Sequence, residues 1–215
     1  MNENFLKKQI ITYMGNKRKF VTIISKIVDD VKQELNNKDL VLADGFSGSG
    51  IIARLFKIKA VSLHVNDIAG YSETLNKCYL STPTTKQQKR IEKLIAKANK
   101  FAYSEDTIKY DKWIQLHWAP SGNITKDQRV YYTEKNGKLI DRYRSFINSL
   151  SENDKPFILA PLLVEASIHN NTNGQFSAFY KDEQGVGKFG GKKEVDIKRI
   201  TTPIKLPLPI FSPSP

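Results

Sequence analysis

The segment from Asp44 to Gly50, which reads Asp-Gly-Phe-Ser-Gly-Ser-Gly, constrains the fold more than any other part of this chain. It follows the apolar run 40–43 and precedes the apolar run 51–56, an order that predicts a strand, a tight turn and a helix. Glycines in such a turn let the backbone approach a ligand, and the helix start offers N–H groups without partners. The acid at the strand end would accept hydrogen bonds from a cationic or hydroxyl-bearing ligand and would repel a pyrophosphate. A nucleoside that carries an amino acid, such as S-adenosylmethionine, therefore fits this loop better than a dinucleotide.

The residues on either side of the loop repeat the same alternation. Residues 60–65 read as a second short strand that ends in Asn66-Asp67, and residues 71–79 read as the helix that follows. Ahead of the loop, apolar residues recur every three or four positions from Phe20 to Leu35, which predicts an amphipathic helix. Strands and helices in this order predict a parallel sheet with right-handed crossovers, and hence an α/β fold.

Asp67 follows the second strand about 20 residues after the glycine loop, where an acid can hold the ribose hydroxyls of a cofactor. Asp is also a favourable residue at a helix start, so Asp67 could instead cap the next helix. The loop leaves a second cofactor open as well. Gly48-x-Gly50-x-x-Ala53 fits the dinucleotide-binding pattern with Ala in the third place, which would suit a nicotinamide-dependent oxidoreductase.

The chain is strongly basic, with 34 Lys and Arg against 22 Asp and Glu and a pI near 9.6. This balance favours a polyanionic partner, such as nucleic acid, through phosphate contacts and counterion release. Cys78 is the single cysteine, which excludes an intrachain disulfide and a multi-cysteine metal site, and we expect no metal. The absence of a secretory signal and of a membrane-length apolar run predicts a cytoplasmic protein without a membrane partner.

The character of the sequence changes after residue 82. Residues 86–100 predict a basic helix, Asn136-Gly137 predicts a hairpin turn, and residues 139–150 predict another amphipathic helix. Residues 157–169 are apolar, but Pro161 leaves helix and strand both open. The tail from residue 203 to 215 is too rich in proline for regular structure.

Three segments in this order resemble one class of DNA adenine methyltransferases. These are Tyr13-x-Gly15-x-Lys17, the loop Asp44-x-Phe46-x-Gly48-Ser49-Gly50, and Asn66-Asp67. Segments of the second half, among them 159–169 and 206–211, also look like enzymes of this class from restriction-modification systems.

The resemblance implies a Rossmann-like, S-adenosylmethionine-dependent α/β sheet, here incomplete, with a basic, mixed α+β DNA-recognition insertion. It divides the chain into a cofactor-binding core at 1–82, a target-recognition region at 83–202 and a Pro-rich tail at 203–215. The implied reaction is transfer of a methyl group to the exocyclic amine of adenine in a short site of double-stranded DNA. A cognate restriction endonuclease would be the partner in the same system.

The residues that we expect to act fall into two sets. The cofactor set, carried by the loop and by the resemblance, comprises Tyr13, Gly15, Lys17, Asp44, Phe46, Ser47, Gly48, Gly50 and Asp67. The DNA set, chosen for phosphate and base-edge contacts, comprises Lys17, Asn173, Lys188, Lys192, Lys193 and Arg199. For His169, a place in the core and a functional role are both open.

The family's downstream motif, Asp/Asn-Pro-Pro-Tyr/Phe, does not occur in these 215 residues. In the family, its polar residue and neighbouring carbonyls hold the target amine, while its aromatic ring stacks on the flipped base. We therefore name no catalytic residue. We expect the N-terminal portion of a methyltransferase that is inactive alone, either truncated or one half of a split enzyme whose second chain supplies the motif. The alternative is a non-catalytic DNA-binding module derived from a methyltransferase.

Overall fold

The structure is a computed structural model that describes residues 3–12, 15, 17–105, 109–172, 178–191 and 194–213. The chain divides into two compact units. Unit 1 comprises residues 1–10, 15–89 and 209–215, and unit 2 comprises residues 11–14 and 90–208. The call on Tyr13, together with those on Asn173, Lys192 and Lys193, lies outside the described residues.

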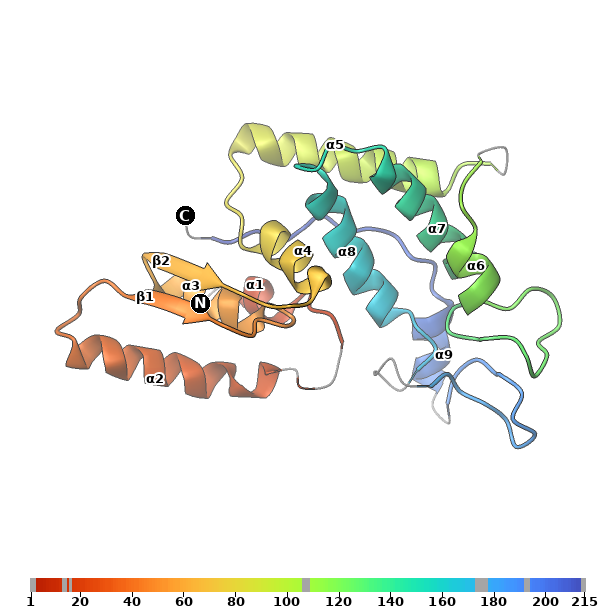
Figure 1. Ribbon diagram of the computed structural model, residues 1–215, viewed down its shortest axis with the longest axis horizontal. Coiled ribbons are helices and arrows are strands. Elements are labelled where there is room, and N and C mark those ends of the chain that lie inside the picture. Colours follow the sequence, from red (N-terminus) through yellow and green to blue (C-terminus); the bar gives the residue numbers. More distant parts are fainter. Residues whose placement is uncertain are drawn as a thin grey trace. The chain divides into compact units, whose positions relative to one another are not determined.

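Unit 1 contains the predicted alternation of strands and helices (Figure 1). Its elements are α1 (Glu3–Lys7), the short 3-10 helix η1 (Arg18–Phe20), α2 (Val21–Glu34), β1 (Val41–Asp44), α3 (Ile51–Lys59), β2 (Ser62–Val65) and α4 (Gly70–Tyr79). The strands β1 and β2 pair in parallel, in register from Val41 opposite Ser62 to Asp44 opposite Val65. The parallel pair joined by α3 confirms the predicted α/β arrangement.

The side chains of the two strands alternate between a half-buried and an exposed face. Leu42 and Leu63 are half-buried, and α3 packs against both strands. Val41 and His64 belong to the exposed face. The small sheet is thus covered on one side within the described chain.

Arg54 of α3 fixes the N-terminal segment to the core of unit 1. Its guanidinium is buried and donates hydrogen bonds of 2.8–2.9 Å to the carbonyl of Phe5 in α1 and to those of Lys8 and Gln9 just after this helix. It also lies 4.1 Å from the ring centroid of Tyr79. Burial lowers the pKa of Arg54 to about 10, so the side chain stays charged at neutral pH. This one residue therefore ties α1, α3 and α4 together.

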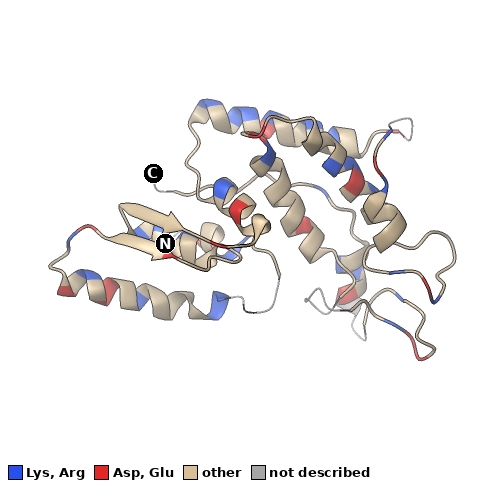
Figure 2. Ribbon diagram, in the orientation of Figure 1, with Lys and Arg blue, Asp and Glu red and all other residues tan. Residues whose placement is uncertain are grey.

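Unit 2 is mainly helical. It holds most of α5 (Thr85–Ala102), together with α6 (Trp113–Trp118), α7 (Glu134–Asn148), α8 (Lys155–Ile168) and α9 (Glu194–Thr201). The basic helix predicted at 86–100 is confirmed as α5, along which Figure 2 shows repeated Lys and Arg positions. The apolar segment 157–169 is helical as α8, with Pro161 inside it.

The predicted hairpin turn at Asn136-Gly137 is wrong, because both residues lie in the first turn and a half of α7. Thr133 caps this helix by accepting a hydrogen bond from the N–H of Asn136. Gly137 is needed for packing rather than for a turn, since a Cβ there would lie 2.9 Å from the Cβ of Ala119, next to α6. The Asn-Gly pair signals a tight helix contact here.

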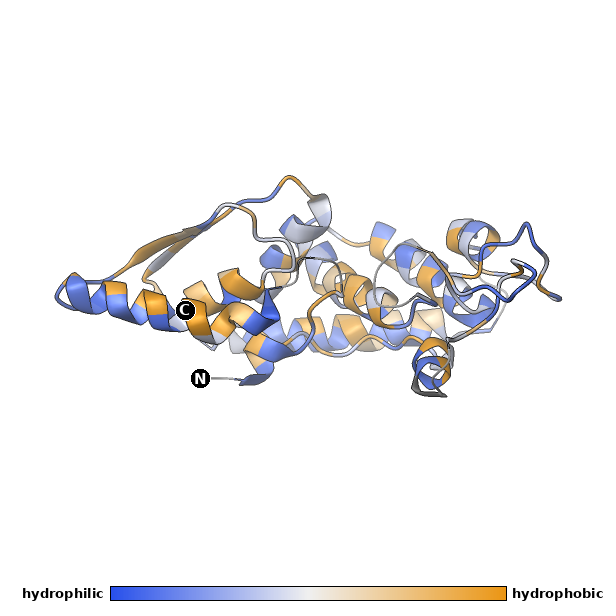
Figure 3. Ribbon diagram, turned by 90° about the horizontal axis from the view of Figure 1, so that it is seen from below, coloured by the Kyte–Doolittle hydropathy of each residue, from blue (hydrophilic) through white to orange (hydrophobic). Residues whose placement is uncertain are grey.

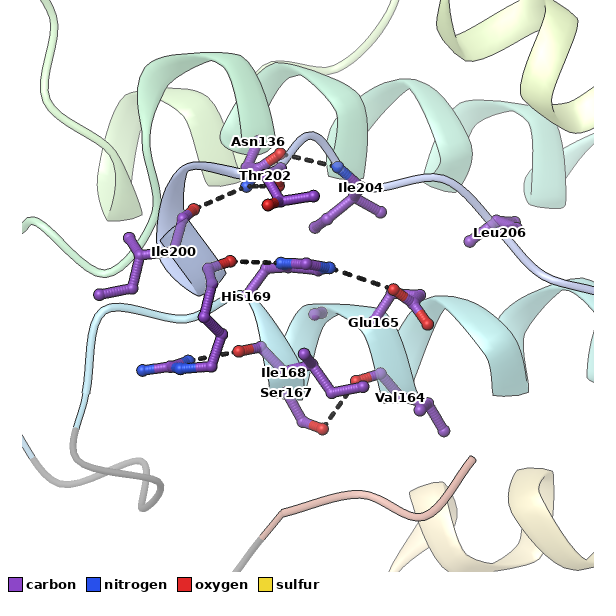
Figure 4. A network of polar contacts seen from close by, with 12 residues as sticks. Asn136, Val164, Glu165, Ser167, Ile168, His169, Ile200, Thr202, Ile204 and Leu206 are labelled. Atoms are coloured by element: carbon purple, nitrogen blue, oxygen red, sulfur yellow. Dashed lines mark hydrogen bonds and ion pairs between the residues drawn. The ribbon is translucent and has the colours of Figure 1, made fainter. Parts of the chain in front are cut away.

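The proline-rich tail lacks helix and strand over 203–211, as predicted, but side-chain amides hold it in place. Asn136 donates to the carbonyls of Ile200 and Thr202 and accepts from the N–H of Ile204 (Figure 4). Asn99 pairs with both the N–H and the carbonyl of Leu206, at 3.0 Å each. Two asparagines thus replace the neighbouring strand that the tail's backbone would otherwise need.

Candidate functional site

The glycine loop connects the carboxyl end of β1 to the start of α3. Gly48 and Gly50 have φ values of +52° and +76°, a left-handed conformation that other residues rarely adopt. The N–H of Gly50 donates to the carbonyl of Ser47 at 2.7 Å, which closes the turn. The geometry therefore requires glycine at these positions of the predicted motif.

The β2–α4 turn holds this loop from the side. The Asp67 carboxylate accepts the N–H of Gly48 at 2.7 Å with one oxygen and the N–H of Ala69 at 2.9 Å with the other. These hydrogen bonds to Ala69 and Gly48 lower the pKa of Asp67. Each oxygen keeps a further lone pair for a ligand hydroxyl. The position of Asp67 in the sequence allowed either ribose binding or capping of the next helix. In the structure its carboxylate holds the turns after β1 and β2 and can still accept a ligand hydroxyl.

A hydroxyl and amide network lies beneath the loop. The Ser47 hydroxyl lies 2.7 Å from that of Ser72, and the Asn76 amide donates to Ser47 at 2.8 Å. A Cβ on Gly50 would lie 2.8 Å from Asn76 Oδ1. Sequence reasoning missed Ser72 and Asn76, although their spacing of four on the helix after Asp67 places them on one face.

Asp44 provides the chemical signal of a ligand site. Its Oδ1 accepts the N–H of Phe46 at 3.4 Å, whereas its Oδ2 is buried and has no hydrogen-bond partner among the described residues. Burial raises the pKa of Asp44, whereas the hydrogen bond from the N–H of Phe46, the nearby charge of Lys17 and the neighbouring N–H of Ala53 act in the opposite direction. Buried carboxylate oxygens normally have a partner, so this oxygen suits an ammonium or hydroxyl donor from outside the protein.

The remaining described residues of the cofactor set, Gly15, Lys17 and Phe46, lie on the surface. Phe46 is 86% exposed on the loop, where its ring is available to an adjacent planar group. Lys17 and Gly15 are also exposed, and Gly15 has a φ of +83°. The charge of Lys17 favours the ionised form of both Asp44 and Asp67, although burial keeps the pKa of Asp44 raised, so this cation lies within electrostatic reach of the loop.

Besides Lys17, two DNA candidates lie within the described residues, and they differ in availability. Lys188 is exposed and its side chain can reach a phosphate. Arg199 instead donates to the backbone carbonyls of Ile168, Asn170 and Thr172 and thereby caps the end of α8. These donors are used within unit 2, so Arg199 has a structural role, and its expected phosphate contact stays a prediction.

His169 is a structural residue, and Figure 4 shows its contact with Glu165. Its Nδ1 lies 2.5 Å from the carbonyl oxygen of Arg199, and its Nε2 lies 3.2 Å from Oε2 of Glu165. Burial alone would lower the pKa of His169, but the hydrogen bonds to Glu165 and Arg199 outweigh it and raise this pKa. The ring joins α8 to α9.

Unit 2 also contains an aromatic cluster that sequence reasoning did not assemble. Trp113, Trp118, Tyr131 and Phe179 form a chain of ring contacts with centroid distances of 4.8–6.1 Å. The Arg129 guanidinium lies 5.6 Å from the Trp118 ring, beside a cavity of about 310 Å³. Aromatic rings with interleaved cations are typical of nucleic-acid surfaces. The signal in the sequence was only the high aromatic content of the segment, because Phe179 is far along the chain from the other three.

Within the described residues, no cluster of three or more His, Cys, Asp or Glu side chains could hold a metal ion. In the same part of the chain, every helix is too short or too polar to cross a membrane.

A glycine loop that follows a half-buried acid at a strand end, and that is held by the acid after the next strand, is typical of the ligand-binding edge of α/β domains. Residues 13–193 match the family of D12 class N6 adenine-specific DNA methyltransferases. The chain belongs to this family, as its sequence motifs indicated. The match supports a methyl donor over the nicotinamide cofactor that the same glycines allowed.

Curated relatives of the chain are restriction-modification methyltransferases. It is 28% identical to the type II methyltransferase M.NlaIII of Neisseria lactamica over 178 residues, 80% of this chain and 50% of the relative. It is 25% identical to the modification methylase StsI of Streptococcus sanguinis over 180 residues, 79% of this chain and 26% of the relative. The chain therefore spans half or less of the length of these relatives. No solved structure matches the chain significantly.

Proposed function

We propose that this chain is the cofactor-binding and DNA-recognition portion of an adenine-specific DNA methyltransferase of a restriction-modification system. The observation that carries the proposal is the buried, unpartnered Asp44 Oδ2 at the glycine loop of a D12 family member. S-adenosylmethionine, when bound, would supply the methyl group that is transferred to the adenine amine.

The loop residues have distinct roles in this proposal. Asp44 accepts a donor of the cofactor with its unpartnered oxygen, and Asp67 accepts a ribose hydroxyl while it holds Gly48. Gly48 and Gly50 keep the backbone close to the ligand, and Phe46 offers an exposed ring. Lys17, Gly15 and Tyr13 complete the site by resemblance to the family.

We assign DNA contact to the remainder of the chain, residues 83–202, as the recognition region. Its support is the basic helix α5, the exposed Lys188, and the aromatic cluster with Arg129. The cations would contact phosphates, and rings or amides would contact bases. Asn173, Lys192 and Lys193 remain candidates from the sequence, Lys17 lies near the DNA entrance by resemblance, and the tail 203–215 leads toward the catalytic segment.

The acceptor amine needs groups that these 215 residues do not supply. In-line transfer requires a held amine and acceptors for its hydrogens, which the family's Asp/Asn-Pro-Pro-Tyr/Phe motif provides. Because that motif does not occur here, the chain alone should not methylate DNA. We propose that the motif lies outside these 215 residues, either further along the same polypeptide or on a second chain, in a cytoplasmic system with a cognate endonuclease.

The direct experiment incubates the purified chain with S-adenosylmethionine labelled in its methyl group and with duplex DNA. We expect cofactor binding, DNA binding that weakens steeply with salt, and no transfer of label by the chain alone. Salt-dependent DNA binding without any cofactor binding would favour the non-catalytic DNA-binding module instead. Label on a base other than adenine, in any reconstituted system, would overturn the proposed specificity.

A further inference from the structure

The cavity of about 310 Å³ in unit 2 lies between helix α6 and the loop that follows this helix. Its walls are formed by residues 115–117 of α6 and by the loop residues 119, 121 and 127–129. Six of these eight lining residues have polar side chains, among them one acid, Asp127, and one arginine, Arg129. The cavity therefore suits a polar ligand that offers both hydrogen-bond donors and acceptors.

The frame of this cavity is fixed by hydrogen bonds. The buried carboxylate of Asp141 accepts two N–H groups at the start of α6, at 2.8 and 3.0 Å. The carbonyl of Trp118, at the end of α6, accepts the N–H groups of Tyr131 and Tyr132 at 3.1 Å each. The loop 119–132 therefore leaves the helix and returns to it at a defined place.

Gln128 holds the middle of the same loop. Its Nε2 donates to the carbonyl of Ser121 at 3.3 Å, and its Oε1 accepts the N–H of Thr125 at 3.1 Å. Gln128 is half-buried, whereas Asp127 and Arg129 on either side of it are exposed. The side chain of Gln128 is thus used within the loop, and its two neighbours are the charged groups that a ligand can reach.

Arg129 has an oriented guanidinium. It lies over the ring of Trp118, 5.6 Å from the ring centroid, and the Trp118 ring in turn contacts that of Tyr131 at 4.8 Å. In the described part of the chain, Arg129 makes neither a hydrogen bond nor an ion pair. A guanidinium held on an aromatic face keeps its N–H donors for a ligand in its own plane, and two adjacent acceptors fit this fork best.

Asp127 distinguishes between the two groups of DNA that such an arginine can contact. Asp127 lines the same cavity, and among the described contacts its carboxylate also has no partner. A carboxylate beside the guanidinium would repel a phosphate, whose oxygens are acceptors like its own. The major-groove edge of a G·C pair instead offers the adjacent acceptors N7 and O6 of guanine and, next to them, the N4 donor of cytosine. This pattern matches Arg129 and Asp127 together.

Exposed lysines near the cavity can supply the phosphate contacts. Lys126 lies beside the turn 182–187, since a Cβ on Gly185 would lie 3.8 Å from Lys126 Cε. Lys181 and Lys188 are exposed at the two ends of that turn. The loop after α6 and this turn extend from the same end of unit 2 in Figure 1, and Figure 3 shows mostly hydrophilic residues there. Phosphate contacts of this kind position a duplex without selecting its sequence.

We infer that Asp127 and Arg129 form a specificity-determining site that reads one G·C base pair of duplex DNA through the major groove. Arg129 donates to N7 and O6 of the guanine, and Asp127 accepts from the N4 amine of the paired cytosine. The inference rests on the proposed function and deepens it, because it names a base pair of the target and the two residues that select it.

The test selects bound sequences from a pool of random duplexes with the wild-type chain and with single variants. The wild type should enrich a site that contains a fixed G·C pair. Arg129→Ala should lower the preference for guanine at one position roughly tenfold, which is within the discrimination of a bidentate contact. Asp127→Ala should relax the same base pair, although loss of a negative charge would by itself strengthen binding to any DNA.

Lys126→Ala is the matched control, because Lys126 is an exposed cation on the same loop. It should weaken binding to all sequences alike, lower the salt dependence by about 0.9 in the slope of log K against log salt, and leave the base preferences unchanged. All three positions are exposed, so each variant should keep the wild-type free energy of unfolding in urea.

A second measurement replaces the selected guanine by 7-deazaguanine, which lacks the N7 acceptor. This replacement should weaken binding to the wild type roughly fivefold and hardly affect binding to Arg129→Ala. An equal loss for both proteins would overturn the guanine contact.

Two further outcomes would overturn the inference without touching the proposed function. One is uniform weakening by Arg129→Ala with unchanged base preferences, which would indicate a phosphate contact. The other is DNA binding by the wild type without any base preference. A wild type that binds neither DNA nor S-adenosylmethionine would instead overturn the proposed function itself.

Discussion

Asp67 Oδ2 accepts a hydrogen bond of 2.7 Å from the backbone N–H of Gly48, and this contact joins the turns after β1 and β2. The acid that follows the second strand thereby sets the shape of the loop that follows the first. A ligand that uses Asp67 would meet a glycine loop already held in position. Preorganisation of this kind lowers the ordering cost of binding.

Substitution of Gly50 should distort the loop. Gly50→Ala places a Cβ 2.8 Å from Asn76 Oδ1 and forces alanine into a left-handed conformation, at φ +76°. The conformational penalty alone is about 1–2 kcal/mol. We expect a lower free energy of unfolding, measured in urea, and weaker binding of S-adenosylmethionine. Gly45→Ala is the matched control, because a Cβ there meets no atom within 4 Å, and equal effects of the two variants would contradict the account.

Arg54 should be essential for the stability of unit 1. Arg54→Met removes the donors to the Phe5, Lys8 and Gln9 carbonyls and keeps much of the aliphatic volume. Unsatisfied buried carbonyls should cost about 3 kcal/mol in the free energy of unfolding. Hydrogen exchange should show the loss first in α1. Arg18→Met is the control, because Arg18 is more exposed. If Arg54→Met lowered the free energy of unfolding no more than Arg18→Met does, Arg54 would not be the residue that links α1 to α3 and α4.

The alternation of unit 1 was predictable because local signals and tertiary contacts agree there. The apolar runs, the glycines and Asp67 each indicate a strand end or a turn, and the structure uses all of them. Unit 2 was harder, because long-range contacts override local preference. Asn136-Gly137 has a hairpin signature, yet Thr133, Ala119 and the returning tail select a helix.

The candidate site was predictable in part. The glycine loop and Asp67 follow from spacing, but sequence could not show that Asp44 retains a buried oxygen without a partner. The sequence also could not show that the Arg199 guanidinium donates hydrogen bonds to three backbone carbonyls at and after the end of α8. Composition suggests a phosphate contact for any arginine in a basic chain. Only the structure shows which of these side chains can contact a phosphate and which already donate hydrogen bonds within the protein.

The stability of unit 2 should depend on the protonation of His169. Its pKa is raised in the folded chain, so protonation favours folding. The contribution should be fully present below the ordinary histidine pKa of about 6.5 and lost as pH rises through the higher folded value. Urea unfolding of the wild type and His169→Gln from pH 5.5 to 9 measures it. The difference in the free energy of unfolding between the wild type and His169→Gln should shrink as the pH rises. His117→Gln is the control for loss of an exposed imidazole. A difference that grows with pH would contradict the assignment.

Anchoring of the tail should depend on Asn99. Its amide pairs with both backbone groups of Leu206, and its Oδ1 also accepts the Tyr143 hydroxyl at 2.6 Å. Asn99→Ala should release residues 203–208, so that limited proteolysis cuts there at least tenfold faster. The exposed Asn148 offers a control, since Asn148→Ala touches no tail contact. Unchanged cleavage in Asn99→Ala would show that the buried Ile204 and Leu206 hold the tail without it.

The most direct test of the central claim is calorimetric titration of the intact chain with S-adenosylmethionine. The account predicts binding to the wild type and at least tenfold weaker binding to Asp44→Ala, a loss of about 1.4 kcal/mol. Asp39→Ala removes the same charge from an exposed position before β1 and should leave the affinity unchanged. Equal affinity of Asp44→Ala and the wild type, or no binding to the wild type at all, would contradict the assignment of this loop as the cofactor site.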